Sequence, residues 1–213
     1  MPVLDYGLQS HPHGSPFVIL PYCEGGSIRN LLRERSFYPF PAVRELLEQA
    51  AAGIDAAHTT GFVHGDVKPE NILLSGTRSH AYLSDLGMSN IFAIQERFTT
   101  RIPGDPGGTT AYLSPEQISQ GQQTALSDIY SFAMLSYELL TGHLPFDQTL
   151  PAFRQMRAKV DGELLDPRRF SPHISEQMKS VLFHGLSRDP VERPRSARGF
   201  CQLLADGGGG RGA

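Results

Sequence analysis

The sequence predicts an α+β fold in which most of the 213 residues form helices around one core. Two observations support this. Apolar residues recur with helical spacing over most of the chain after residue 40. Runs that suit strands are short, are bounded by turn-forming residues and lie before residue 85. The length is sufficient for a sizeable core.

Composition narrows the class of protein. The chain has 19 basic and 22 acidic side chains, so it offers no broad cationic surface, and nucleic acid is not an expected ligand. Cys23 and Cys201 have no metal-type spacing and are expected to be reduced thiols. The N-terminus has no secretory pattern, and no apolar run approaches the length of a membrane helix. We therefore expect a soluble, cytoplasmic protein with no membrane segment.

The first elements are expected to be short. Residues 3–6 and 17–20 read as two strands around a turn-rich loop, and they suit an edge hairpin. Ser27 is a suitable N-cap for a helix reaching Arg35. Pro41 opens a longer helix that ends near Gly61. Its buried face is predicted to consist of Val43, Leu46, Leu47, Ala50, Ala51, Ile54 and Ala57.

Two further strands, 72–74 and 81–84, flank a polar turn. They are followed by a predicted loop from Asp85 to about Glu116. Loops of that length in compact domains usually contact ligands or regulate activity, so substrate contact or regulation is expected here.

The remaining chain is predicted to be helical. From Thr124 to Gly142 apolar residues occur on nearly all sides, which is typical of a helix buried at the centre of a domain. Three more helices are expected, over 151–160, 175–186 and 197–204. The glycine-rich end has no strand before it, so we interpret it as a flexible tail and not as a phosphate loop.

The sequence HGDVKPENILL, residues 64–74, carries the chemistry. A carboxylate such as Asp66 can deprotonate a hydroxyl, Lys68 can neutralise a phosphate, and the Asn71 oxygen can bind magnesium. Asp85 follows a strand and precedes a glycine, as a second metal ligand requires. Each of these residues alone is more often an ordinary surface or turn residue. Together they indicate a magnesium–nucleotide site for phosphoryl transfer.

The sequence resembles the C-terminal lobe of the eukaryotic-type Ser/Thr protein kinases, including their bacterial members. HGDVKPENILL is similar to the family's catalytic loop, DLG at 85–87 to its D-F-G motif, and GTTAYLSPE at 108–116 to the end of its activation segment. The resemblance implies a protein-kinase-like fold with a mainly helical large lobe. It also implies ATP and Mg²⁺ as cofactors and a protein with Ser or Thr hydroxyls as substrate.

Catalytic and metal-binding roles follow from the resemblance position by position. Asp66 would orient the substrate hydroxyl, and Lys68 would contact the transferred phosphate. Thr109 would bond to Asp66 and Lys68. Asn71 and Asp85 would hold magnesium.

The resemblance also implies structural roles. Glu116 would pair with Arg193 and so tie the activation segment to the last helices. Asp128 would hold the backbone of the catalytic loop, and His64 would be a packing residue and not a base.

The stretch FVILPYCEGGS is similar to the family's adenine-binding hinge. Leu20 would be the gatekeeper, the backbone of Pro21 and Cys23 would bond the purine, and Leu73 would form the floor. Ordinary core packing is the competing interpretation of these apolar side chains. The expected organisation is therefore a small-lobe remnant, a hinge, a large lobe and a flexible tail, over residues 1–20, 21–26, 27–205 and 206–213.

Three departures from the family pattern bear on activity. The glycine-rich loop, the strand lysine and the helix glutamate of the small lobe are not found in the 213 residues, which begin at what would be the fourth strand. Gly65 replaces the usual arginine, which argues against control through phosphorylation of Thr99 or Thr100. Leu86 replaces phenylalanine, a tolerable apolar exchange.

Three functions are therefore considered. The first is a Ser/Thr protein kinase, here as an N-terminally truncated fragment with weak or no activity alone, since losing one charge-stabilising donor typically costs about 3 to 4 kcal/mol of transition-state stabilisation. The alternative is a catalytically inactive kinase-like binding module. A small-molecule kinase of the aminoglycoside type also uses an H-G-D loop, but the GTTAYLSPE segment argues against it.

Overall fold

The structure is a computed structural model, and it describes residues 3–8, 16–35, 37–86 and 110–208. The helices and strands follow one another in this order: β1 (Asp5–Leu8), β2 (Pro16–Ile19), α1 (Ile28–Glu34), α2 (Phe40–Thr59), β3 (Ile72–Leu74), β4 (Ala81–Leu83), α4 (Pro115–Gln120), α5 (Ala125–Thr141), α6 (Ala152–Asp161), α7 (Glu176–Gly185) and α8 (Ala197–Gly208). Short 3₁₀ turns lie at Pro69–Asn71, Thr110–Tyr112, Pro167–Arg169 and Pro190–Glu192.

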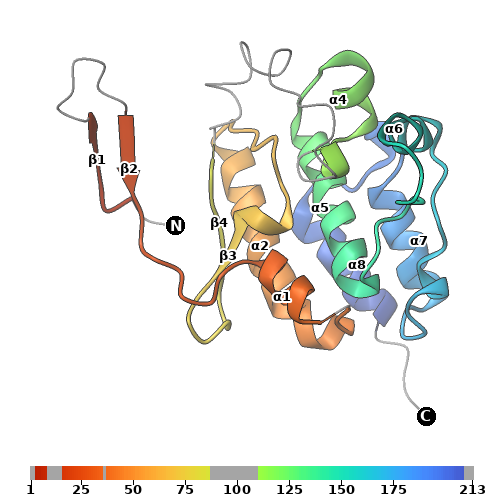
Figure 1. The fold of residues 1–213 in the computed structure, drawn as a ribbon, viewed down its shortest axis with the longest axis horizontal. Helices are drawn as coiled ribbons and strands as arrows, with labels where there is room; N and C mark the ends of the chain where they lie inside the picture. The colour runs from red at the N-terminus through yellow and green to blue at the C-terminus, as the bar shows by residue number, and fades with distance from the viewer. Residues whose placement is uncertain (1–2, 9–15, 36, 87–109, 209–213) are drawn as a thin grey trace.

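The helices form the body of the molecule. Helix α5 lies in its centre, with α7 on one side and α2 with strands β3 and β4 on the other, while α8 packs against both α2 and α7 (Figure 1). Nearly every side chain of α5 is buried, as the apolar sequence predicts. The predicted apolar face of α2 is buried in full, and Phe40 joins it. Helix α5 lies between the predicted limits: Thr124 caps it, and Gly142 ends it in a left-handed conformation.

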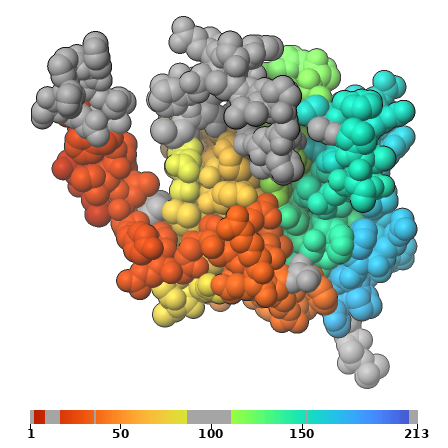
Figure 2. Space-filling view, in the orientation of Figure 1, coloured from red at the N-terminus to blue at the C-terminus, as the bar shows by residue number. Residues whose placement is uncertain are grey.

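Strands β1 and β2 form an antiparallel hairpin that projects from the helical body (Figures 1 and 2). The pair is the edge hairpin expected from the sequence, but β1 begins at Asp5, two residues after the predicted start. Its apolar side chains are mostly exposed, for example Tyr6 at 78% and Leu8 at 70%. Burial on the helical body therefore contributes little to the stability of this hairpin.

Helix α4 was not predicted, and it begins within the last residues of the stretch expected to be a loop, which was to end at about Glu116. Ser114 accepts a hydrogen bond from the Gln117 N–H, and the Gln117 side chain returns a contact to the Ser114 backbone. This is a capping box, a signal that the sequence SPEQ does contain. The predicted loop is therefore helical at its C-terminal end.

Helix α8 runs to Gly208, three residues into the predicted flexible tail. Glycine has low helix propensity, but tertiary packing overrides it here. Gly207 is buried, and its carbonyl accepts a hydrogen bond of 2.7 Å from the Ser175 hydroxyl at the start of α7. A Cβ at Gly207 would lie 3.1 Å from the Met178 nitrogen, so the close packing favours glycine.

Two further sequence expectations can be compared with the described residues. In the described part of the chain Cys23 and Cys201 form no disulfide bond, in agreement with the expected reduced thiols. Within the described ranges no helix is both long enough and apolar enough to cross a membrane.

Candidate active site

Asp128, a fully buried residue in the first turn of α5, holds the loop that follows α2. Its Oδ2 accepts hydrogen bonds of 2.8 Å from the His64 N–H and from His58 Nε2, and its Oδ1 accepts one of 2.7 Å from the Gly65 N–H. A buried carboxylate needs several donors to offset its desolvation. Asp128 therefore holds the loop by its backbone, as the sequence led us to expect. His58 was not singled out from the sequence.

His64 is also fully buried and uses both ring nitrogens. Its Nε2 lies 2.7 Å from the Ser84 carbonyl, and its Nδ1 lies 3.2 Å from the Asp66 N–H. A carbonyl can only accept and a backbone N–H can only donate, so the proton belongs on Nε2. The ring thus links the loop to the end of β4, which fits the structural role expected for it.

Gly65 has a φ of +74°, in the left-handed region that favours glycine. A Cβ at this position would lie 1.2 Å from the Gln123 side-chain nitrogen. The positive φ therefore favours glycine at position 65, and a larger residue would also have to displace the end of the Gln123 side chain.

Asp66, Lys68 and Asn71 meet at the end of this loop. Lys68 Nζ lies 2.6 Å from Asp66 Oδ2, and the Asn71 side-chain nitrogen donates to the Asp66 carbonyl at 2.8 Å and to Asp66 Oδ2 at 3.1 Å. Both partners of the amide nitrogen are acceptors, which fixes the orientation of the amide. Asn71 Oδ1 consequently faces away from Asp66 and is available as an oxygen ligand.

Asp85 reaches the same region through the β3–β4 pair. Ile72 pairs with Leu83, and the Ser84 N–H and hydroxyl both donate to the Asn71 carbonyl, at 2.9 and 3.1 Å. Asp85 follows directly, is exposed and has a φ of +59°, a conformation that aspartate tolerates better than most residues. The pairing brings Asp85 close to Asn71 and, through it, to Asp66.

The oxygen donors fit a magnesium ion. Carboxylate and amide oxygens are its preferred ligands, and Mg²⁺ usually takes one or two carboxylates and completes its shell with water and substrate phosphates. Accordingly, a cage of three or more His, Cys, Asp or Glu side chains is not needed, and none occurs among the described residues.

The C-terminal end of the predicted hinge lies beside β3. Ser27 forms a bridge with Leu73, and the Gly25 N–H donates to the Leu74 carbonyl at 3.1 Å. Leu20, Pro21, Cys23 and Leu73 are each partly exposed, so none of these side chains is locked in the core. A Cβ on Gly25 would lie 2.0 Å from the Ser75 carbonyl, which explains the glycine at this close approach.

Glu116 and Arg193 form the predicted bidentate pair, with Oε1–Nη1 and Oε2–Nη2 distances of 2.7 and 2.8 Å. The Arg193 side chain is fully buried and packs over the Tyr130 ring. Burial opposes ionisation of Glu116, but the hydrogen bonds from Arg193 and Ser127 outweigh it, so its pKa lies below the usual value. The pair fastens α4 to the segment before α8.

Arg29 of α1 joins four elements and was not predicted. It donates to Glu70 within the HGDVKPENILL stretch at 2.7 Å, to Glu138 of α5 at 2.8 Å and to the Tyr112 hydroxyl at 2.6 Å. Burial alone would lower the pKa of Arg29, but the interactions with Glu138, Tyr112 and Glu70 raise it above the usual value. No short motif could have revealed a cluster made by residues so far apart in sequence.

Lys159 of α6 is a second unpredicted contact to the segment near the site. Its side chain is 3% exposed, its Nζ donates to the Ala111 carbonyl, and it lies 4.9 Å from the centre of the Phe146 ring. Burial lowers the pKa of Lys159 to about 7. Thr109, predicted to bond to Asp66 and Lys68, lies outside the described residues, as do Thr99 and Thr100.

Comparisons with known proteins agree with this geometry. The sequence profile of the protein kinase domain matches residues 8–204. A serine/threonine-protein kinase, PknL of Mycobacterium tuberculosis, is 38% identical over 180 residues, which cover 84% of this chain and 43% of PknL. The serine/threonine-protein kinase pkn2 of Myxococcus xanthus is 33% identical over 208 residues, covering 95% of this chain and 24% of pkn2. The chain thus spans less than half the length of these relatives.

The fold is also similar to a solved structure. Rad53 residues 1–466, crystallised with AMP-PNP, superposes with a TM-score of 0.72 at 24% sequence identity, covering 93% of this chain and 50% of that one. This similarity confirms the protein-kinase-like fold predicted from the sequence.

Proposed function

The chain belongs to the protein kinase family, and from that membership we propose that it transfers the γ-phosphate of ATP to serine or threonine hydroxyls of a protein. The observation that carries the proposal is the pair of hydrogen bonds from the Asn71 amide nitrogen to Asp66, at 2.8 and 3.1 Å, together with the Ser84–Asn71 hydrogen bond just before Asp85. Phosphoryl transfer depends mainly on positioning and charge stabilisation, which such a cluster can provide.

Each residue has a distinct task in this proposal. Asp66 orients the substrate hydroxyl and accepts its proton, and Lys68, 2.6 Å from the same carboxylate, neutralises charge on the transferred phosphate. Asn71 and Asp85 hold Mg²⁺, which would neutralise charge on the ATP phosphates when bound. Leu20, Pro21, Cys23 and Leu73 surround the adenine.

A kinase-like binding module is the second candidate, and one observation favours it. The chain has three lysines, and each of them contacts a residue other than Asp85. Lys68 pairs with Asp66, Lys159 binds the Ala111 carbonyl, and Lys179 pairs with Glu176. We therefore propose that the 213 residues alone transfer phosphate more slowly than complete kinases.

The test separates nucleotide binding from turnover. Calorimetry should show ATP binding that requires Mg²⁺ and that weakens at least about tenfold in Asp85→Asn, since a charged ligand is lost. Asp206→Asn, an exposed carboxylate on α8, is the matched control and should bind as the unchanged chain does.

Turnover is then followed with radiolabelled ATP, a mixed protein substrate and phosphoamino-acid analysis. Any transfer should yield phosphoserine or phosphothreonine and should disappear in Asp66→Asn. Magnesium-dependent binding without detectable transfer would favour the binding module. ATP binding that is indifferent to magnesium and to Asp85→Asn would contradict the proposed kinase site.

A further inference from the structure

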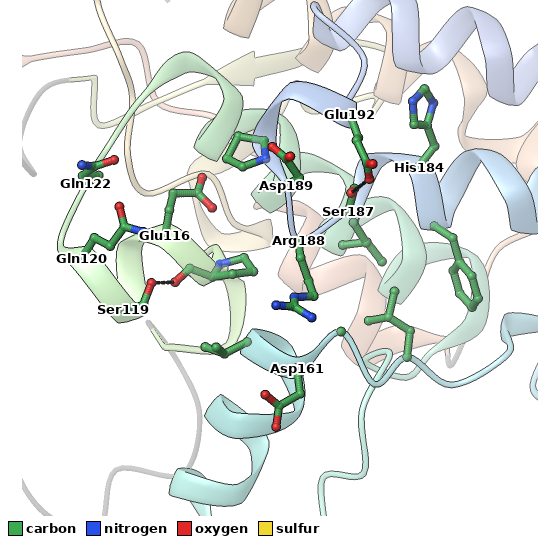
Figure 3. A pocket seen from close by; sticks show the side chains of 17 residues that line it. Glu116, Ser119, Gln120, Gln122, Asp161, His184, Ser187, Arg188, Asp189 and Glu192 are labelled. Atoms are coloured by element: carbon green, nitrogen blue, oxygen red, sulfur yellow. Dashed lines mark hydrogen bonds between the residues drawn. The ribbon is translucent and has the colours of Figure 1, made fainter.

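An open pocket lies between α4, α6 and the end of α7, with a volume of about 820 Å³ (Figure 3). Of the residues discussed above, Glu116 alone lines it, and the catalytic loop, Asp85 and the hinge do not. The pocket is therefore a site distinct from the proposed nucleotide site. Its size suits a few side chains of a peptide.

The floor of the pocket is apolar. Val160 and Leu164 come from α6 and the segment after it, and Phe183 and Leu186 from the end of α7. Leu186 is 2% exposed, whereas Leu164, Phe183 and Val160 remain partly exposed to solvent. An apolar side chain placed against them would remove this surface from water.

The acidic groups around the pocket already have partners within the protein. Glu116 is bound by Arg193 and Ser127, and Asp161 pairs with Arg157 at 2.6 Å. The remaining two, Asp189 and Glu192, accept hydrogen bonds from the Val191 N–H at 3.0 Å and from the Ser187 hydroxyl at 2.6 Å. These contacts reduce the attraction that the carboxylates offer to an incoming cation.

Arg188 differs from these groups. Its side chain extends into the pocket between α4 and α6 (Figure 3), and its aliphatic part lies over Gly162. A Cβ at Gly162 would be 2.7 Å from Arg188 Cδ, so glycine makes room for the arginine. In the described part of the chain Arg188 makes no ion pair, and its guanidinium keeps its donors for a ligand.

We propose that this pocket docks a protein segment in which an apolar side chain stands next to a carboxylate. The apolar side chain packs on Val160, Leu164 and Phe183, and the carboxylate accepts hydrogen bonds from the Arg188 guanidinium. Docking needs neither nucleotide nor phosphoryl transfer, so it goes beyond the proposed function and can fail or succeed independently of it.

Two capped peptides test the proposal: acetyl-Ala-Phe-Glu-Ala-amide and acetyl-Ala-Phe-Lys-Ala-amide. They are titrated into chain with ¹³C-labelled Leu and Val methyl groups. The Glu peptide should shift the methyl signals of Val160, Leu164 and Leu186 and bind more tightly than the Lys peptide. Arg188→Ala should weaken the Glu peptide by about tenfold, the scale of one hydrogen bond to a charged group.

Charge reversal gives the decisive comparison. Arg188→Glu should reverse the preference, so that the Lys peptide binds and the Glu peptide does not. Arg33→Glu, at the exposed end of α1, changes the net charge equally and should leave the preference unchanged. Arg188 is exposed, and an unchanged methyl spectrum without peptide shows that each variant is folded.

Unshifted pocket methyls with both peptides would overturn the proposal. So would a preference for the Glu peptide that survives in Arg188→Glu, or one that is lost equally in Arg33→Glu. A preference of the unchanged chain for the Lys peptide would show that the carboxylates dominate, and it would also refute the proposal.

Discussion

The Asp128 carboxylate accepts the Gly65 N–H at 2.7 Å across 63 residues of sequence. This one contact joins the central helix to the loop that carries Asp66, Lys68 and Asn71. The position of the loop therefore depends on a fully buried residue of the central helix α5. The role of a supporting residue such as Asp128 can therefore be tested by measuring the stability of a variant as well as its activity.

Asp128→Ala should lower the free energy of unfolding by about 3 to 5 kcal/mol, because three donors around a buried site lose their acceptor. Asp128→Asn keeps one acceptor oxygen and should cost less. Urea denaturation measures both changes. A loss in Asp128→Ala below about 1 kcal/mol, the scale of a single ordinary hydrogen bond, would show that the loop is held by other contacts.

Glu116→Ala should destabilise the protein by about 3 to 5 kcal/mol, since the fully buried Arg193 would lose its counter-ion. The double variant Glu116→Leu with Arg193→Met removes both charges and should be more stable than Glu116→Ala. A double variant that is no better would contradict the explanation by an unpaired buried charge.

The ion pair of Glu116 and Arg193 also makes the free energy of unfolding depend on pH. The pKa of Glu116 is lowered from 4.5, so its contribution is complete above pH 4.5 and is lost as the pH falls through the folded-state pKa. The difference in unfolding free energy between the unchanged chain and Glu116→Gln should therefore shrink on acidification below pH 4.5. Denaturation curves at neutral and acidic pH measure it, and a constant difference would contradict the prediction.

The lowered pKa of Lys159 predicts that the stability of the protein changes with pH in the neutral to alkaline range. Burial lowers its pKa from 10.5 to about 7, so between these values the unfolded state binds more protons than the folded state. Stability from this group should rise as the pH increases from about 7 towards 10.5. Relative to Lys159→Met, the unchanged chain should gain unfolding free energy over this range. A parallel pH dependence in the two proteins would count against a depressed pKa.

Gly65→Ala should destabilise through two separable effects. A left-handed alanine costs about 1 to 2 kcal/mol, and the new Cβ would displace the Gln123 side chain. Gln123→Ala in the same chain should recover the steric part but not the conformational part, so the effects of the two substitutions should not add. Thermal unfolding of the single and double variants provides the comparison. Simple additivity would show that Gln123 does not fill this space.

Much of the fold was predictable because local signals agreed with burial. The apolar spacing in α2 and α5, the cap at Thr124 and the glycine at 142 each act over one helix, and the structure has all of them. The missed helix α4 also carried a local signal, the capping box that begins at Ser114. The extension of α8 did not, because its glycines are held only by packing against α7.

The sequence by itself determined the type of chemistry, since the loop around Asp66, the residue Asp85 and the Glu116 segment occur in one order and with recognisable spacing. Tertiary structure alone decided which charged groups meet residues that are distant in sequence and which stay open to solvent. The meeting of Arg29 with Glu70, Glu138 and Tyr112, the burial of Lys159 against Ala111 and the open Arg188 all depend on it. The physical reason is range: capping and periodicity act within one helix, whereas long-range ion pairs and pockets form only where the packing of whole helices brings side chains together.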